Sequence, residues 1–144
     1  MTSVARQWNA AGRSLRARRA VVVVASIAAP VVLWFVAVKM LDVDLTVPSG
    51  DDGGTSPVGL GDVALAATAA SLVLWIALTL LEQVTSLAMD VWSVSAIALI
   101  LLTLGAGGME GMRDDDLDAL VAMHLAHTLT LVVGFRRATP ADRG

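Results

Sequence analysis

The stretch that decides the fold is AVVVVASIAAPVVLWFVAVKML, residues 20–41. Its apolar side chains run on without the alternation of a half-buried strand, and its length falls in the range of about 17–25 residues that crosses a bilayer as a helix. A helix satisfies its own backbone hydrogen bonds, which a lone strand in lipid does not. The pattern therefore predicts a transmembrane helix.

The composition extends this prediction to the whole chain. Hydrophobic residues make up 56% of 144 residues, and the mean hydropathy is +0.74. Charged residues make up 16%, against about a quarter in a soluble domain, and almost all of them lie in the N-terminal tail, the loops and the last residues. We predict an all-α, polytopic membrane protein whose four transmembrane helices form a bundle, at about residues 20–41, 62–81, 91–108 and 117–135.

The first stretch follows a basic segment, as the apolar region of a secretory signal peptide does. It is longer than the roughly 7–15 apolar residues of a signal peptide, has no clean cleavage site at its end and precedes further apolar stretches. We therefore expect it to remain as the first helix.

The basic residues predict the orientation. Of ten Lys and Arg residues, eight lie in the segments before the first helix and at the end of the last one. Only Lys39 and Arg113 are expected at the opposite face of the membrane. Because basic segments stay in the cytoplasm, we predict a basic cytoplasmic tail at 1–19, a four-helix transmembrane domain at 20–137 and a cytoplasmic C-terminal tail at 138–144. The connection EQVTSLAMD then lies on the same side, although it has no basic residue.

The opposite face is acidic, most clearly in RDDDLD, residues 113–118. Hard oxygen ligands suit calcium or magnesium, but the spacing fits no EF-hand loop. We favour solvated carboxylates at Asp114, Asp115 and Asp116 that stabilise the start of the last helix. The sequence therefore predicts no metal site here.

Polar side chains follow one stripe of the second predicted helix. Residues at steps of three and four share a helix face, and the stripe consists of Thr68, Ser71, Trp75, Thr79 and Glu82. In the first helix, Pro30 has no N–H, so the carbonyl of Ser26 loses its usual donor.

Two histidines lie in the last apolar stretch, DALVAMHLAHTLTLVVGFRR, residues 118–137. At 100° per residue, His124 and His127 share a face, and polar side chains in a membrane usually turn toward the protein interior. We predict that both histidines line a polar ligand-binding pocket in the outer half of the bundle. The neighbours expected there are Thr68, Ser71, Trp75 and Thr103.

Three roles for these histidines stay open. They can make structural hydrogen bonds across a helix interface, handle a proton or a ligand, or bind haem or a metal ion. Haem or metal at His124 and His127 is the least favoured, because two nitrogens on one helix have no third ligand at the same depth. We therefore predict no cofactor.

Glu82 ends the second stretch and is, with His124 and His127, a candidate catalytic residue. We favour an ion pair between Glu82 and Arg136 or Arg137, near the end of the last helix, over a proton-coupling carboxylate.

Three segments carry a family resemblance: GDVALAATAASLVLWIALTLLEQVT, VWSVSAIALILLTLG and MHLAHTLTLVVGF. They resemble a family of small four-helix actinobacterial membrane proteins catalogued as a domain of unknown function, over about residues 20–137. The matching marks are Glu82, Trp92, Met123 and His124; His127 is not assigned to the pattern. The resemblance implies the architecture and a bacterial inner-membrane address, and no activity.

The favoured function is that of a small integral membrane protein binding or handling a hydrophobic small molecule within its bundle, in a transport-accessory or binding role. An alternative is a membrane-embedded isomerase or cyclase on a lipid-soluble substrate, with His124 or His127 as acid-base groups and Ser71 or Thr68 orienting the substrate. A second alternative is a structural subunit of a membrane complex.

The expected partners are the lipid bilayer, a hydrophobic small molecule, and a second copy or a partner membrane protein. Nucleic acid is excluded, because the basic residues are explained by topology and the net charge is −3. The chain also lacks a phosphate-binding glycine loop, GxSxG and HExxH.

Overall fold

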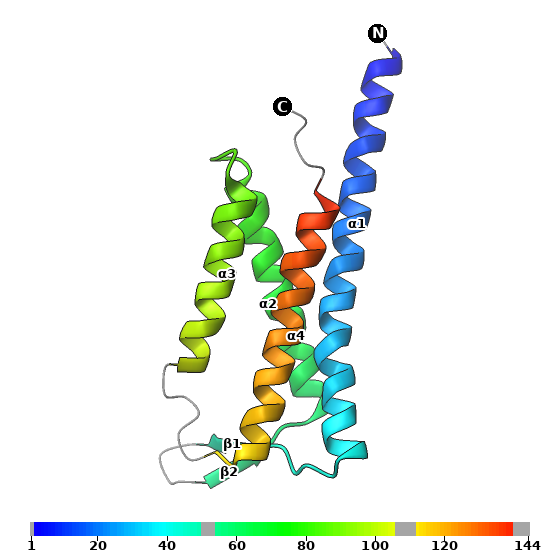
Figure 1. Ribbon diagram of the computed structural model, residues 1–144. Helices are drawn as coiled ribbons and strands as arrows, with labels where there is room; N and C mark the ends of the chain where they lie inside the picture. Colours follow the sequence, from blue (N-terminus) through cyan, green and yellow to red (C-terminus); the bar gives the residue numbers. More distant parts are fainter. Residues whose placement is uncertain (1, 50–53, 106–111, 140–144) are drawn as a thin grey trace.

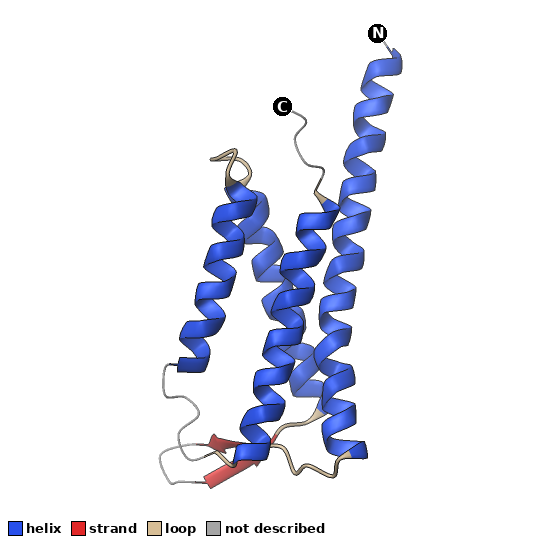
Figure 2. Cartoon of the chain, viewed as in Figure 1, coloured by secondary structure: helices blue, strands red, loops and turns tan. Residues whose placement is uncertain are grey.

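The computed structural model describes residues 2–49, 54–105 and 112–139. This part of the chain forms four α-helices and one two-stranded antiparallel hairpin (Figures 1 and 2). The elements are α1 (Thr2–Phe35), β1 (Thr46–Ser49), β2 (Gly54–Pro57), α2 (Leu60–Leu81), α3 (Ala88–Gly105) and α4 (Asp114–Ala138). The helices lie side by side, with the hairpin at the end away from the start of α1 (Figure 1).

Helix α1 is longer than the sequence predicts. It begins at Thr2 rather than near residue 20, so the described part of the basic tail continues the helix instead of forming a separate segment. Alanine and arginine, both strong helix formers, are frequent there. A π-helical turn, Val36–Met40, ends the helix, and the chain then reverses at Asp42, which has φ 56°.

The other helices lie close to their predicted ranges. Helix α2 begins two residues before the predicted position 62, and α4 extends three residues beyond each predicted end. Helix α3 is described to Gly105; the predicted end at 108 lies outside the described residues. So does the C-terminal tail after residue 139.

Three of the described helical segments are long and apolar enough to cross a membrane: Ser14–Met40, Leu60–Leu81 and Asp114–Ala138. The apolar part of α3, Ala88–Thr103, is shorter. Large apolar side chains remain exposed on all four helices, such as Val24, Leu65, Val94 and Leu129. An exposed apolar surface of this extent is typical of a membrane protein.

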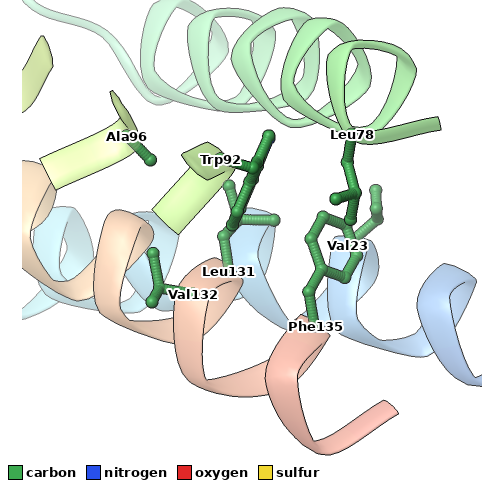
Figure 3. Close-up of a cluster of buried hydrophobic side chains, with 7 residues drawn as sticks. All are labelled: Val23, Leu78, Trp92, Ala96, Leu131, Val132 and Phe135. Carbon is green, nitrogen blue, oxygen red and sulfur yellow. The ribbon is translucent and has the colours of Figure 1, made fainter. Parts of the chain in front are cut away.

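The main core lies in the half of the helices away from the hairpin. Figure 3 shows side chains from all four helices pointing toward one another; they are Val23, Leu78, Trp92, Ala96, Leu131, Val132 and Phe135. The ring centroids of Trp92 and Phe135 are 5.4 Å apart, and the angle between the ring planes is 55°. The indole Nε1 of Trp92 also donates to the carbonyl of Leu74 at 2.9 Å. Trp92 of α3 thus contacts both α2 and α4.

A second core cluster closes the hairpin end. Trp34, Ala37, Leu45 and Met123 are buried together. Trp34 Nε1 donates to the carbonyl of Val58, just after β2, at 2.8 Å. Apolar packing and one indole hydrogen bond therefore hold the hairpin segment against α1 and α4.

Asp116 differs from the solvated carboxylate predicted at the start of α4. Its side chain is only 1% exposed, and its Oδ2 accepts a hydrogen bond from Thr46 Oγ1 of β1 at 2.9 Å. Asp114 and Asp115 are exposed, as predicted. Asp116 differs because the hairpin covers the first turn of α4 on that side, a tertiary contact that the sequence did not reveal.

Helices α1 and α4 approach each other closely at Gly134. A Cβ atom at this position would lie 2.5 Å from Cγ1 of Val22. Because valine is stiff at χ1, Val22 cannot simply swing away. The absence of a side chain at Gly134 therefore permits the observed packing of the two helices.

We predict that Gly134→Ala destabilises the protein by about 1 kcal/mol, because overpacking outweighs the gain in helix propensity. Thermal unfolding of the purified protein in a fixed detergent measures the effect. Gly61→Ala is the matched control, since no atom lies within 4 Å of a Cβ there. Adding Val22→Ala should remove the penalty of Gly134→Ala; an unchanged penalty would show that the clash is not its cause.

Candidate functional site

A missing backbone hydrogen bond in α1 determines the geometry of the site. Pro30 has no N–H, so the carbonyl of Ser26 cannot accept the helical bond from that position. The ring Nδ1 of His127 in α4 lies 2.9 Å from this carbonyl oxygen. A carbonyl only accepts, so Nδ1 carries the proton, and in a neutral ring Nε2 is then a bare acceptor.

The side chain of Ser26 adds a third helix to this contact. Its Oγ lies 2.8 Å from the carbonyl of Val23 and 2.9 Å from Oγ of Ser71 in α2. Ser26 has one hydroxyl proton, which it gives to the Val23 carbonyl, so Ser71 is the donor of the second bond. Ser26, Ser71 and His127 are all buried. One polar network therefore joins α1, α2 and α4.

A hollow with a volume of about 320 Å³ lies next to this network. Its lining comes from α1, α2, α4 and the hairpin segment, and most of it is apolar. The lining residues are Pro30, Val47, Val58, Asp62, Val63, Ala66, Ala67, Ala70, Leu120, Met123, His124 and His127. The α2 side of the hollow is formed largely by alanines, whose small side chains leave space that larger residues would fill.

Both histidines line the hollow, at different depths. His127 is 9% exposed, and its Nε2 is buried without a hydrogen-bond partner among the described residues. The ring of His124 is exposed, and its Nδ1 donates to the carbonyl of Leu120 at 2.8 Å. By the same reasoning, a neutral His124 also keeps a bare Nε2. The hollow is therefore a largely apolar space whose lining includes two histidines, one of them with a buried, unpaired Nε2 among the described residues.

An imidazole nitrogen in this state can accept a hydrogen bond, act as a base or bind a metal ion. Within the described ranges, no group of three or more His, Cys, Asp or Glu side chains could hold a metal ion. Asp62 is the one carboxylate among the lining residues, and its Oδ2 accepts the backbone N–H of Gly59 at 2.8 Å.

The structure brings only part of the predicted pocket together. Ser71 lies one hydrogen bond from Ser26, beside His127. Thr68 bonds the carbonyl of Ala64 in its own helix at 2.7 Å, and Trp75 packs against the main core. Neither residue lines the hollow. Mid-helix hydroxyls commonly bond the preceding turn in this way.

Thr103 also lies away from the histidines. It is exposed near the end of α3, and its hydroxyl bonds the carbonyl of Leu99 at 2.9 Å. Figure 1 shows α2 and α3 close together near their connection and diverging toward the hairpin end. The lining residues of α2 and the hairpin segment take the place of the predicted polar neighbours. The alanine spacing of residues 66 and 70 could have indicated the α2 side, and the turn-forming run SGDDGGTS, residues 49–56, could have indicated the hairpin.

The ion pair predicted for Glu82 forms with a different arginine. Arg19 is buried and makes two hydrogen bonds to the Glu82 carboxylate, one of them at 2.8 Å, and a third to Thr139 Oγ1 at 3.1 Å. Arg136 instead pairs with Asp90 at 2.9 Å. The prediction of Arg136 or Arg137 as the partner is wrong. It assigned Arg19 to a separate tail, whereas the continuous α1 brings Arg19 against the ends of α2 and α4.

The chain belongs to a family of unknown function, DUF6069, whose model matches residues 10–141. This confirms the resemblance to an uncharacterised family. No curated protein and no solved structure matches the chain.

We predict that Pro30→Ala and His127→Leu are coupled in their effects on stability. His127→Leu alone leaves the Ser26 carbonyl buried and unpaired, at a cost of about 1–3 kcal/mol. In a Pro30→Ala background, the new backbone N–H can satisfy that carbonyl, so the same change at residue 127 should cost less. Unfolding free energies of the four proteins in one detergent give the coupling.

Thr130→Val is the matched control, because the Thr130 hydroxyl bonds only the carbonyl of Ala126 in its own helix. Its cost should be the same in the wild-type background and in the Pro30→Ala background. Strict additivity of Pro30→Ala and His127→Leu would contradict the assignment of the Ser26 carbonyl to His127.

Proposed function

We propose that this chain is a multi-pass protein of the bacterial cytoplasmic membrane, with four spanning helices and both termini in the cytoplasm. The apolar surfaces of the helices support insertion. Arg19, Arg136 and Arg137 lie at the end of the helices away from the hairpin, in agreement with the rule that basic residues stay inside. The connection EQVTSLAMD between α2 and α3 has no basic residue. Its first and last residues, Glu82 and Asp90, pair with Arg19 and Arg136.

Single cysteines test this topology, because the natural chain has none. Thr55→Cys, exposed in β2, should react with a membrane-impermeant maleimide on intact spheroplasts. Gln83→Cys, exposed after α2, should react only after lysis. The reverse pattern would invert the orientation, and equal labelling of both positions on intact spheroplasts would contradict the crossing of the membrane by α2.

We propose further that the protein binds a hydrophobic small molecule in the hollow between α1, α2 and α4, in a binding or transport-accessory role. The observation that carries this proposal is that His127 lines an apolar space and that its buried Nε2 has no partner among the described residues. Buried polar atoms are nearly always paired in folded proteins. Small-molecule sites typically combine an apolar lining with a few placed polar groups, in volumes from about 300 Å³ upward.

A catalytic role has less support. A bare imidazole nitrogen is also a general base, but an enzyme needs further groups that orient or activate the substrate. Ser71 and Thr68, the side chains expected to orient a substrate, make hydrogen bonds within and between helices instead. We therefore rank binding above an isomerase or cyclase activity.

Filling the hollow tests the binding proposal. Ala70 is exposed and lines the hollow, so Ala70→Phe should occupy the space without disturbing the buried core. Lipid-like material that co-purifies with the wild type, quantified by mass spectrometry, should fall to background in this variant. Ala69→Phe, exposed on the same helix but outside the lining, is the matched control and should retain it. Equal amounts in all three proteins would contradict binding in the hollow.

A further inference from the structure

We infer that the molecule bound in the hollow carries an uncharged hydrogen-bond donor, in its simplest form a hydroxyl, and that this group donates to Nε2 of His127. The inference rests on the proposed binding function and narrows it to a ligand class: hydrophobic molecules with a donor head.

Each of the two histidine rings has its proton on Nδ1. Nδ1 of His127 donates to the Ser26 carbonyl, and Nδ1 of His124 donates to the Leu120 carbonyl. Both carbonyls are acceptors only, so neither ring can turn its donor toward the hollow without losing a bond. The two histidines therefore offer acceptors to a ligand and no donor.

The chemistry of the head follows from this allocation. An ether or ester head has only acceptors, so it would leave Nε2 of His127 buried and unpaired, at a cost. A hydroxyl supplies the missing proton. An ammonium head would have to leave water for a largely apolar space, which is costly without a buried counter-charge. The carboxylate of Asp62 belongs to an exposed residue at the start of α2 and already accepts the N–H of Gly59.

The positions of the two rings indicate how the ligand lies. His127 is buried, whereas His124, one turn nearer the hairpin end, is exposed. The donor head is placed at His127 because, of the two lining histidines, it is the one whose Nε2 is buried without a partner among the described residues. The apolar part of the ligand then packs against Ala66, Ala70 and Met123, which line the same hollow.

Matched probes test the ligand class. Native mass spectrometry measures the binding of 1-dodecanol, 1-methoxydodecane and dodecylamine to the full chain in lipid nanodiscs at equal probe-to-lipid ratio. The wild type should bind the alcohol about tenfold more tightly than the ether, the range expected when one buried acceptor gains or lacks its partner. The amine should bind no better than the ether.

His127→Asn tests the role of Nε2 separately from the role of Nδ1. The amide N–H of asparagine can still donate to the Ser26 carbonyl, whereas its remaining acceptor, Oδ1, lies on the shorter side chain and does not reach the position of Nε2. The ratio of alcohol to ether affinity should fall to about one in this variant, through weaker alcohol binding. Thr130→Val, one turn along α4 and outside the lining, should keep the wild-type ratio.

A spectroscopic readout on the wild type complements the variant. The ¹⁵N resonance of His127 Nε2 should shift on addition of the alcohol and stay in place with the ether. This readout decides the question even where His127→Asn does not fold.

The outcomes distinguish this inference from the function on which it rests. Equal binding of alcohol and ether, with both lost in Ala70→Phe, would overturn the donor head and leave binding in the hollow standing. Preference for the amine, or a preference for the alcohol that survives in His127→Asn, would also overturn it. No binding of any probe to a folded wild type, together with no co-purified ligand, would overturn both proposals.

Discussion

The proline in the middle of α1 removes one backbone donor, and the carbonyl that loses it must be satisfied from another helix. A buried, unpaired carbonyl costs about 1–3 kcal/mol, because no water is present to replace the lost bond. His127 supplies the donor, and the hydroxyls of Ser26 and Ser71 extend the contact to α2. These hydrogen bonds join α1, α2 and α4 at one level of the bundle.

The same hydrogen bond gives the candidate site its chemistry. With Nδ1 committed to Ser26, the orientation of the His127 ring is fixed and Nε2 remains as a buried acceptor. The space beside it exists because α2 presents alanines there, while α1 lies against both α2 and α4. The other end of the helices is closed by the core around Trp92 and by Arg19 with Glu82. One end is thus rigidly packed, and the hairpin end contains the hollow.

The sequence predicted the positions of the four helices well, because long apolar stretches are local signals. It also indicated the free carbonyl of Ser26, since the loss of a donor at Pro30 follows from covalent structure. It did not predict which side chain would take that carbonyl. The partner of Glu82 and the burial of Asp116 were predicted wrongly for a related reason: both depend on contacts between distant segments. Helical periodicity shows which residues share one face of a helix, but it does not show how that helix is rotated against its neighbours. For this reason Thr68, Trp75 and Thr103 were predicted to line the pocket and do not line it.

A measurement of which His127 ring nitrogen carries the proton tests most directly whether the Ser26 carbonyl orients this ring. Solid-state ¹⁵N NMR of protein labelled at histidine, in lipid bilayers at neutral pH and with His124→Asn for assignment, distinguishes the protonated from the bare nitrogen. We predict a neutral His127 ring with the proton on Nδ1, and loss of this single tautomer in Pro30→Ala. A ring protonated on Nε2, or a tautomer indifferent to Pro30, would show that the Ser26 carbonyl does not orient His127.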